Sequence, residues 1–292
     1  MTEKLIHENM SKQEILVSNP EYLEKATEQM RADGPDKLHV LADFDKTLTR
    51  AVVDGQASPS VIAQLRNNKI LGQTNYAEQA HALFNKYYTY ETDQQLSFAE
   101  RSEQMKKWWH EHHELLIKCG LDQESINAVV AKKTLQLRTG TLNFVDILHN
   151  NNIPLVIMSA APAYMIARYL AQEDRLYDII KIIGNWYIFD ANGKMIGVEE
   201  PIIHVLNKRE ITLGDKPEFA EIKKRRNVIV LGDTLEDTDM ITGFDYDQLI
   251  KIGFYNQPTD ENLDKYRETF DIVITGDGNM NYVNELLQKI IS

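Results

Sequence analysis

The sequence has almost no cysteine and no long apolar run. Cys119 is the only cysteine in 292 residues, so no disulfide can form within the chain, and its apolar helical surroundings predict a packing role. No apolar stretch reaches the roughly 18 residues typical of a membrane-spanning helix. The first residues, Met1 to Gln13, are polar and charged, unlike the apolar segment of a signal peptide. Together these absences predict a soluble, cytoplasmic protein.

Runs of lysine and arginine are also missing. The chain has 32 basic and 44 acidic residues, a net charge of −12 with histidine counted as neutral. We therefore expect neither a nucleic-acid duplex nor a membrane as partner, but a small molecule. A monomer is the default expectation, although the sequence leaves the oligomeric state open. An acidic protein that binds an anionic substrate needs local positive charge, from a metal ion, a lysine or a helix N-terminus.

One stretch of the sequence organises the rest. The apolar run Leu38–Ala42, which predicts a short buried strand, stops at two acids, Asp43 and Asp45. Two carboxylates this close repel each other unless a cation lies between them or one is protonated. Open α/β sheets bind ligands at the carboxyl ends of their strands, which suggests a metal site. The alternative is a turn in which the aspartates only cap the backbone.

Strands and helices alternate over most of the chain. Further strands are predicted at residues 154–158, 179–183, 227–231, 249–253 and 272–275, and Asn192-Gly193 indicates a hairpin. Residues 58–67, 76–88, 98–118 and 123–137 instead predict consecutive helices with no strand among them. We expect an α/β fold with a doubly wound, mostly parallel, Rossmann-like sheet. Residues 1–50 and 138–292 would form this core, and residues 51–137 an inserted helical cap domain.

Polar residues of catalytic type follow three of the predicted strands. Asp43 could attack phosphorus as a nucleophile, and Asp45 could protonate the leaving oxygen and then activate water. Asp233, together with Asp43, would offer hard oxygen ligands for Mg²⁺. Ser159, at a predicted helix start, could donate to a phosphate oxygen, helped by the N–H of Ala160.

A lysine between the second and the last of these strands completes the set. Lys208 would supply a fixed positive charge where negative charge develops during phosphoryl transfer.

These residues together resemble the motifs of haloacid-dehalogenase-type phosphatases. Asp43-Phe44-Asp45-Lys46-Thr47 is similar to the first motif, Asp-x-Asp-x-Thr, and Ser159 resembles the second. Lys208 resembles the third motif, and Gly232-Asp233 followed by Asp237 resembles the fourth. All four occur in order, and they span the whole predicted core.

Longer segments narrow the resemblance to the cytosolic type III pyrimidine 5′-nucleotidases. They are Asp43–Thr49, Ile203–Lys208, Leu249–Gly253 and Tyr266–Ile274. The chain departs from that family between Arg50 and Asn75, where it lacks the cysteine-bearing loop of animal members. The resemblance implies a Mg²⁺-dependent phosphomonoesterase that hydrolyses UMP and CMP to nucleoside and phosphate through an aspartyl-phosphate.

The resemblance also implies roles for the core residues. Asp43 would be the nucleophile and Asp45 the acid and base. Asp43, the backbone carbonyl of Asp45 and Asp233 would hold Mg²⁺, with Asp237 in support or, alternatively, only capping the helix that follows. The implied phosphate ligands are Thr47, Ser159, Ala160 and Lys208.

Three residues of the predicted cap match base-binding positions of the family. Glu100 corresponds to a glutamate that recognises the base, and Trp108 and His113 align with a tryptophan and a histidine further along. Each has a simpler explanation. Ser97 and Glu100 form a capping-box pattern, Trp108 lies on an apolar helical stripe, and His113 could be an ordinary surface histidine.

Two rival functions remain open at this point. The same chemistry could act on another small phosphorylated metabolite, such as a phosphoserine-like compound, or could transfer phosphate to a nucleoside. A non-catalytic nucleotide-binding protein is the alternative from another class. The complete set of Asp43, Asp45, Lys208 and Asp233 favours an enzyme.

Overall fold

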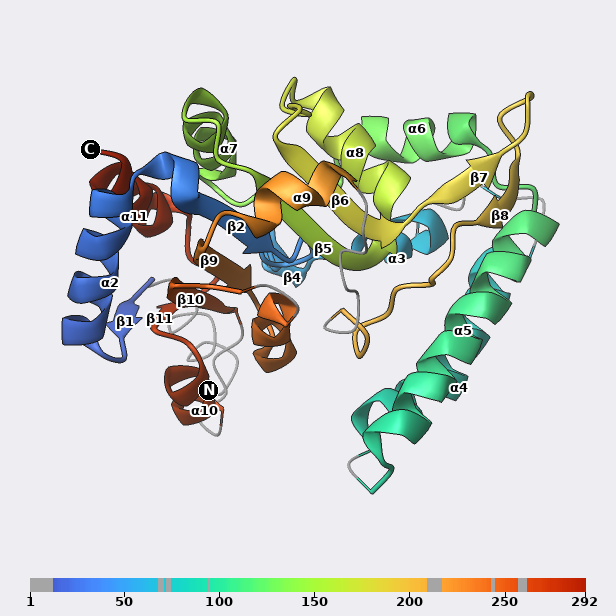
Figure 1. The fold of residues 1–292 in the computed structure, drawn as a ribbon. Helices are drawn as coiled ribbons and strands as arrows, with labels where there is room; N and C mark the ends of the chain where they lie inside the picture. The colour runs from blue at the N-terminus through green and yellow to red at the C-terminus, as the bar shows by residue number, and fades with distance from the viewer. Residues whose placement is uncertain are drawn as a thin grey trace.

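The computed structural model describes residues 13–67, 71, 75–93, 95–208, 217–242, 245–256 and 262–292. Its main sheet has seven strands: β1 (Ile15–Val17), β2 (Leu38–Ala42), β5 (Leu155–Pro162), β6 (Ile180–Asn185), β9 (Asn227–Gly232), β10 (Gln248–Tyr255) and β11 (Ile272–Thr275). The strand order is β1-β11-β10-β9-β2-β5-β6, and all neighbours are parallel except β1 and β11. The predicted mostly parallel α/β sheet is therefore confirmed (Figure 1).

Helices cover the sheet on both faces, as a doubly wound fold requires. They are α2 (Pro20–Asp33), the short η1 (Pro35–Lys37), α7 (Thr141–Asn150), α8 (Ala163–Gln172), α9 (Pro217–Lys223), α10 (Leu263–Thr269) and α11 (Asn281–Ile291). Successive strand side chains point to opposite faces. Val40 and Ala42 accordingly pack in the cluster that holds buried residues of α2, α7, α8 and α11. Leu41 packs in a second cluster, with Phe219 and Ile222 of α9.

The chain between β2 and β5 forms a largely helical insertion. It contains α3 (Val61–Asn67), α4 (Tyr76–Thr92), α5 (Phe98–Lys118) and α6 (Gln123–Ala131). α4 and α5 form a long hairpin that extends away from the sheet, at the lower right of Figure 1. Val61 of α3 and Ile126 of α6 instead belong to the same hydrophobic cluster as the core strands. The boundaries of the cap, residues 51–137, remain a prediction.

The two linkers of this insertion lie side by side. Thr49 and Leu137 form an antiparallel bridge. The N–H of Arg50 donates to the carbonyl of Gln136, and the N–H of Arg138 donates to the carbonyl of Leu48, both at 2.9 Å. The chain therefore leaves and re-enters the core at one place.

The expectation of no strand in the insertion is wrong. β3 (Val52–Val53) and β4 (Gln56–Ala57) form a small hairpin. Its turn, Asp54-Gly55, has positive φ at both residues, 51° and 74°. Asp-Gly is a preferred sequence for such turns, so a recognisable signal was present.

Three other elements differ from the prediction. α6 ends at Ala131 rather than Leu137, and Lys133, with φ 52°, adopts the left-handed conformation that ends many helices. β5 continues through an irregularity to Pro162, so Ser159 lies inside the strand and not at a helix start. Edge strand β1 was not predicted.

The remaining elements agree with the sequence. β7 (Tyr187–Phe189) and β8 (Met195–Val198) form the hairpin expected around Asn192-Gly193. The sequence also predicts a helix over residues 260–269; its first two residues, Asp260 and Glu261, lie outside the described residues, and α10 covers Leu263–Thr269. Within the part of the chain described here, no helix combines the length and apolar character needed to cross a membrane.

Candidate active site

Asp43 lies at the centre of the carboxyl edge of the sheet. It follows β2 directly, and β2 is flanked by β9 and β5, so the residues after these three strands meet. The backbone N–H of Asp43 donates to the carbonyl of Leu231 in β9 at 3.0 Å. The Asp43 side chain is buried. The strand order therefore brings together what the sequence separates by almost 200 residues.

Lys208 pairs directly with two of the acids. Its Nζ lies 2.5 Å from Oδ1 of Asp43 and 3.0 Å from Oδ1 of Asp237, and all three side chains are buried. Burial alone would lower the pKa of Lys208, but the charges of Asp237 and Asp43 outweigh burial and raise it. Lys208 is therefore a permanent positive charge beside the Asp43 carboxylate.

Asn185 at the end of β6 anchors the segment that leads to Lys208. Its side-chain amide donates to the carbonyls of Ala160 and Ile203, at 2.7 and 2.9 Å, and its oxygen accepts from the N–H of Ile203. Asn185 is fully buried. A buried amide with these partners fixes the Lys208 segment against the end of β5.

Asp45 is attached to the insertion as well as to the core. Its Oδ1 accepts a hydrogen bond of 2.9 Å from the N–H of Val61, the first residue of α3. Burial and the charge of Asp43 raise the pKa of Asp45 to about 7, although the Val61 N–H opposes this. A carboxyl group with such a pKa can both give and take a proton near neutral pH, which general acid–base catalysis requires.

The acidic residues also form a potential metal site. Three carboxylate oxygens lie within 4.8 Å of one another, one each from Asp43, Asp233 and Asp237. Asp237 is already engaged, because its Oδ2 accepts from Asp233 N–H and from both N–H and Oγ1–H of Thr234. Among the described side chains, none donates to the Asp233 carboxylate. Asp43 and Asp233 are thus the carboxylates better suited as ligands.

The charge balance of this cluster fits a divalent cation. Burial and the charges of Asp237 and Asp43 raise the pKa of Asp233 well above its ordinary value. Burial also raises the pKa of Asp43, while Lys208 opposes the rise. One lysine therefore leaves an excess of negative charge, and hard carboxylate oxygens are the ligands that Mg²⁺ prefers.

Gly232 permits the close approach of Asp237. A Cβ atom at position 232 would lie 2.3 Å from the Cβ of Asp237. Only glycine therefore fits before Asp233. In this close position, Asp237 caps the 3₁₀ helix η2 (Leu235–Ile241) and also pairs with Lys208. The capping role weighed for Asp237 from the sequence is thus present in its contacts, and its support of Mg²⁺ remains a prediction.

The predicted phosphate ligands lie around the same edge. Ser159 is buried, and its Oγ accepts a hydrogen bond of 3.2 Å from Ala161 N–H, which leaves its own hydrogen to donate. Ala160 is partly exposed beside it. Thr47 is buried, and its Oγ1 has no hydrogen-bond partner in the described part of the molecule. An orphaned buried hydroxyl needs a partner, and a phosphate oxygen would supply one.

The three predicted cap residues do not come together. Glu100 and His113 are thirteen positions apart on α5, about 20 Å at 1.5 Å per residue. No single base can contact both. Their roles in base binding therefore cannot all hold at once, and each remains a separate prediction.

Each of these residues also has a structural role. The Oε2 atom of Glu100 accepts from the N–H and the hydroxyl of Ser97 in a capping box, and the residue is exposed. Trp108 packs on Tyr87 of α4, with ring centroids 6.5 Å apart. His113 is not on the surface, because it is buried edge-on against Tyr187, 5.6 Å away. Burial lowers the pKa of His113 to about 3.

A cavity of about 310 Å³ connects the site to the tip of the α4–α5 hairpin. Its lining comprises Phe98 and Arg101 from α5, Val205, Leu206 and Lys208 from the neighbouring loop, and Leu235, Glu236 and Asp239 from η2. This volume is at the lower end of the range for small-molecule sites. The sequence did not indicate Arg101, whose Nε is buried without a partner among the described residues.

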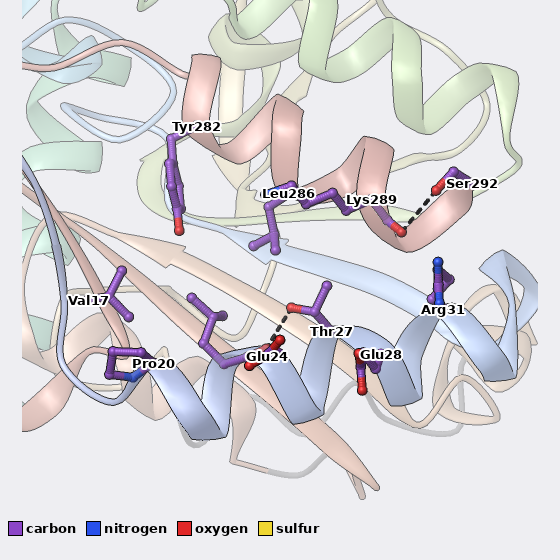
Figure 2. A pocket seen from close by; sticks show the side chains of 11 residues that line it. Val17, Pro20, Glu24, Thr27, Glu28, Arg31, Tyr282, Leu286, Lys289 and Ser292 are labelled. Atoms are coloured by element: carbon purple, nitrogen blue, oxygen red, sulfur yellow. Dashed lines mark hydrogen bonds between the residues drawn. The ribbon is translucent and has the colours of Figure 1, made fainter.

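A larger groove, of about 470 Å³, lies elsewhere. Figure 2 shows it between α2 and α11, with Leu286 and Tyr282 on one side and Glu24 and Thr27 on the other. None of the polar residues at the carboxyl ends of β2, β5 and β9 lines it. The volume of a cavity therefore does not identify the catalytic site in this protein. The convergence of charged side chains identifies it.

Three residues near the nucleophile were missed from the sequence. Arg138 donates to the carbonyls of Lys46 and Thr47, and Asn256 donates to that of Lys46. Asp277 pairs with Arg138 at 3.2 Å. Asn256 and Asp277 are polar residues that follow β10 and β11, so they carry the same sequence signal as Asp43 after β2. For Arg138 the sequence offers no comparable signal.

The fold and the site define a phosphatase of the haloacid-dehalogenase-like class. A phosphoserine phosphatase in complex with its substrate shares the fold at 17% identity, with a TM-score of 0.52 over 85% of this chain and 96% of that one. A much closer structure is cytosolic 5′-nucleotidase IIIB bound to cytidine, with a TM-score of 0.86 and 28% identity, covering 98% of this chain and 96% of that one.

Sequence comparison identifies the family within this class. The family model of pyrimidine 5′-nucleotidase (UMPH-1) matches residues 46–291. The 7-methylguanosine phosphate-specific 5′-nucleotidase of Rattus norvegicus is 32% identical over 284 residues, covering 97% of this chain and 94% of that protein. The chain belongs to the UMPH-1 pyrimidine 5′-nucleotidase family. It is a nucleotidase of the haloacid-dehalogenase type, and the non-catalytic alternative is no longer needed.

Proposed function

We propose that this nucleotidase hydrolyses UMP and CMP, with Mg²⁺ as its metal ion, through an aspartyl-phosphate on Asp43. The observation that carries the proposal is the convergence of a buried carboxylate, a permanently charged lysine and further acids at one sheet edge. The matching family model, which is described as a pyrimidine 5′-nucleotidase, supports the choice of substrate.

In the first step, an oxygen of Asp43 attacks the phosphorus of the substrate. The new Asp43 O–P bond forms as the bond between phosphorus and the nucleoside O5′ breaks, and Asp45 gives its proton to O5′. Lys208 stabilises the charge on the transferred group, and Thr47, Ser159 and Ala160 contact its oxygens. Because Asp45 accepts a hydrogen bond from the N–H of Val61, its carboxyl group is held in one orientation.

In the second step, water replaces the nucleoside. Asp45, now ionised, takes a proton from that water as it attacks the phosphorus, and the Asp43 O–P bond breaks to release phosphate. Bound Mg²⁺ would neutralise the carboxylates and the phosphate and polarise the phosphoryl group. Asp43, the Asp45 carbonyl and Asp233 are the proposed ligands, and Asp237 holds Lys208 beside them.

A 7-methylated purine nucleotide is the second candidate substrate. The observation in its favour is the rat relative, whose name specifies 7-methylguanosine phosphate and whose alignment covers 97% of this chain at 32% identity. The cavity of about 310 Å³ also has one aromatic side chain in its lining, Phe98, on which a base with delocalised positive charge could stack.

A substrate panel tests these proposals. Phosphate release is measured from UMP, CMP, AMP, GMP, 7-methyl-GMP and phosphoserine, with Mg²⁺ and with EDTA. We expect release that EDTA abolishes and that is fastest for UMP and CMP. Preference for 7-methyl-GMP would select the second candidate, while equal rates for all substrates, phosphoserine included, would overturn the assignment of a base-specific enzyme.

A further inference from the structure

Arg138 is a buried arginine whose donors all point at the catalytic loop and its surroundings. Its side chain is 1% exposed. Its hydrogen-bond acceptors are the carbonyls of Lys46, Thr47 and Gly278 and the side chains of Asn256 and Asp277. Its guanidinium carbon lies 4.2 Å from the centre of the Phe254 ring. The planar fork of arginine can serve this many acceptors at once, and no other side chain can.

Two of these acceptors belong to the turn that carries the catalytic acids. Lys46 and Thr47 directly follow Asp45, and Lys46 has φ 61°, a conformation that non-glycine residues rarely adopt. The Lys46 carbonyl accepts from both Arg138 and Asn256, and the Thr47 carbonyl accepts from Arg138 Nε at 2.8 Å. These bonds hold the turn in an otherwise unfavourable conformation.

Asp277 extends the same network to the linker that enters the insertion. Its carboxylate accepts from the N–H groups of Ala51 and Val52, at 2.8 and 3.2 Å, and from Nε of Arg50 at 3.4 Å. Arg138 itself lies on the returning linker, where its N–H donates to the carbonyl of Leu48. The pair Arg138–Asp277 therefore joins both linkers to the turn after the nucleophile.

We propose that Arg138, together with Asp277, is a positioning residue for phosphoryl transfer. The pair keeps the turn at residues 44–47 and the two linkers in fixed register, so that Asp43 and Asp45 face the phosphorus and the leaving oxygen correctly. This inference rests on the proposed reaction. It assigns no contact with substrate to Arg138.

The test separates positioning from simple burial of a charge. Arg138→Lys keeps the charge beside Asp277, but an ammonium group cannot reproduce the fork across the carbonyls of Lys46 and Thr47. Asp277→Asn keeps the shape of the side chain and weakens its hold on the linker. Asp146→Asn is the matched control, because it breaks a partly exposed ion pair with Arg175, of 2.7 Å, outside this network.

Values of kcat and KM are measured for UMP and for p-nitrophenyl phosphate with Mg²⁺, per folded molecule as quantified by near-UV circular dichroism. We expect kcat of Arg138→Lys to fall by about 10- to 100-fold, while KM changes less than about threefold, because misalignment slows the chemical step more than binding. Asp277→Asn should show the same pattern to a smaller degree, and Asp146→Asn none.

Several results would overturn the inference. A kcat within twofold of the unmodified enzyme in folded Arg138→Lys would do so, as would equal effects of Asp277→Asn and Asp146→Asn. Should Arg138→Lys fail to fold, Asp277→Asn alone decides between the same outcomes. Lack of hydrolysis by the unmodified enzyme would overturn the proposed function and this inference together, whereas an active enzyme with unaffected variants would overturn the inference alone.

Discussion

The carboxyl edge of the sheet and the α4–α5 hairpin were both predicted to supply substrate-binding side chains, but the two regions arrange their residues differently. At the sheet edge, neighbouring parallel strands end at one level, so residues from distant parts of the chain meet, as Asp43, Lys208 and Asp237 do. Along a helix, residues from one segment are spread out, as Glu100 and His113 are. Residues far apart in the sequence thus converge at strand ends, whereas residues close together in the sequence are spread along a helix.

The strongest test of the sheet edge is Asp43→Asn. The amide has the shape of the carboxylate but cannot act as the nucleophile, so kcat for UMP should fall by at least about 10⁴-fold. Because the substitution also removes one of the mutually repelling acids, the melting temperature should not decrease. Phosphate release and thermal unfolding are measured on the same preparation. A variant with normal turnover would remove the basis for treating this edge as the catalytic site.

Asp45→Asn sharpens the comparison by asking what the second acid does. Loss of a general acid should lower kcat for UMP by about 10²- to 10⁴-fold, because the departing nucleoside alkoxide needs a proton. p-Nitrophenol is a far better leaving group, so its ester should suffer much less in the same step. Rates for both esters are compared before and after the substitution. Equal losses for the two esters would contradict an acid role for Asp45.

Glu100→Gln tests the hairpin at its most exposed predicted residue. Glutamine can also occupy this position of a capping box, so helix α5 should keep its stability. The free Oε1 of Glu100 can accept a hydrogen bond from a base, and its replacement should raise KM for UMP about three- to tenfold. p-Nitrophenyl phosphate, which has no base, is the control. An unchanged KM for UMP would assign Glu100 to capping alone.

His113→Phe should affect stability and not substrate binding. Because the pKa of His113 is lowered to about 3, the unfolded chain takes up a proton first as the pH falls below about 6.5. His113 therefore favours folding above that pH, and this advantage declines by about 2 kcal/mol between pH 6.5 and pH 5. The unmodified protein should accordingly lose stability relative to His113→Phe over this range.

The catalytic carboxylates also make stability depend on pH, in the opposite direction, because their pKa values are raised. Both the unmodified protein and His113→Phe contain them, so their contribution cancels when the two stabilities are compared. The measurements are urea unfolding of both proteins at several pH values and, alongside, KM for UMP. A pH-independent difference in stability, or a higher KM in His113→Phe, would show that His113 has another role.

The sequence predicted the sheet edge well because its signals are local. Each buried strand is a short apolar run with polar residues directly after it, and the order of strands then follows from the fold class. Lys208 was included from its place between two of these strands and from its match to a family motif, because it does not directly follow a strand. Asn185, which anchors its segment, looks like an ordinary strand residue.

The insertion was harder to predict for physical reasons. Helical periodicity gave α4 and α5 with small errors, but it cannot show which face of α5 meets α4 and which meets the core. His113 illustrates this, because its burial depends on Tyr187, 74 positions later in the chain. Arg138 was missed for a similar reason, since five acceptors from three separate segments define its role.

The bridge between Thr49 and Leu137 has a consequence for how such enzymes can diversify. An excursion whose two ends already touch can be lengthened, shortened or exchanged without opening the sheet, and the entropy cost of closing a longer loop grows only slowly with its length. New specificities can therefore evolve by replacing the excursion, while the strands that carry the chemistry keep their sequence and spacing.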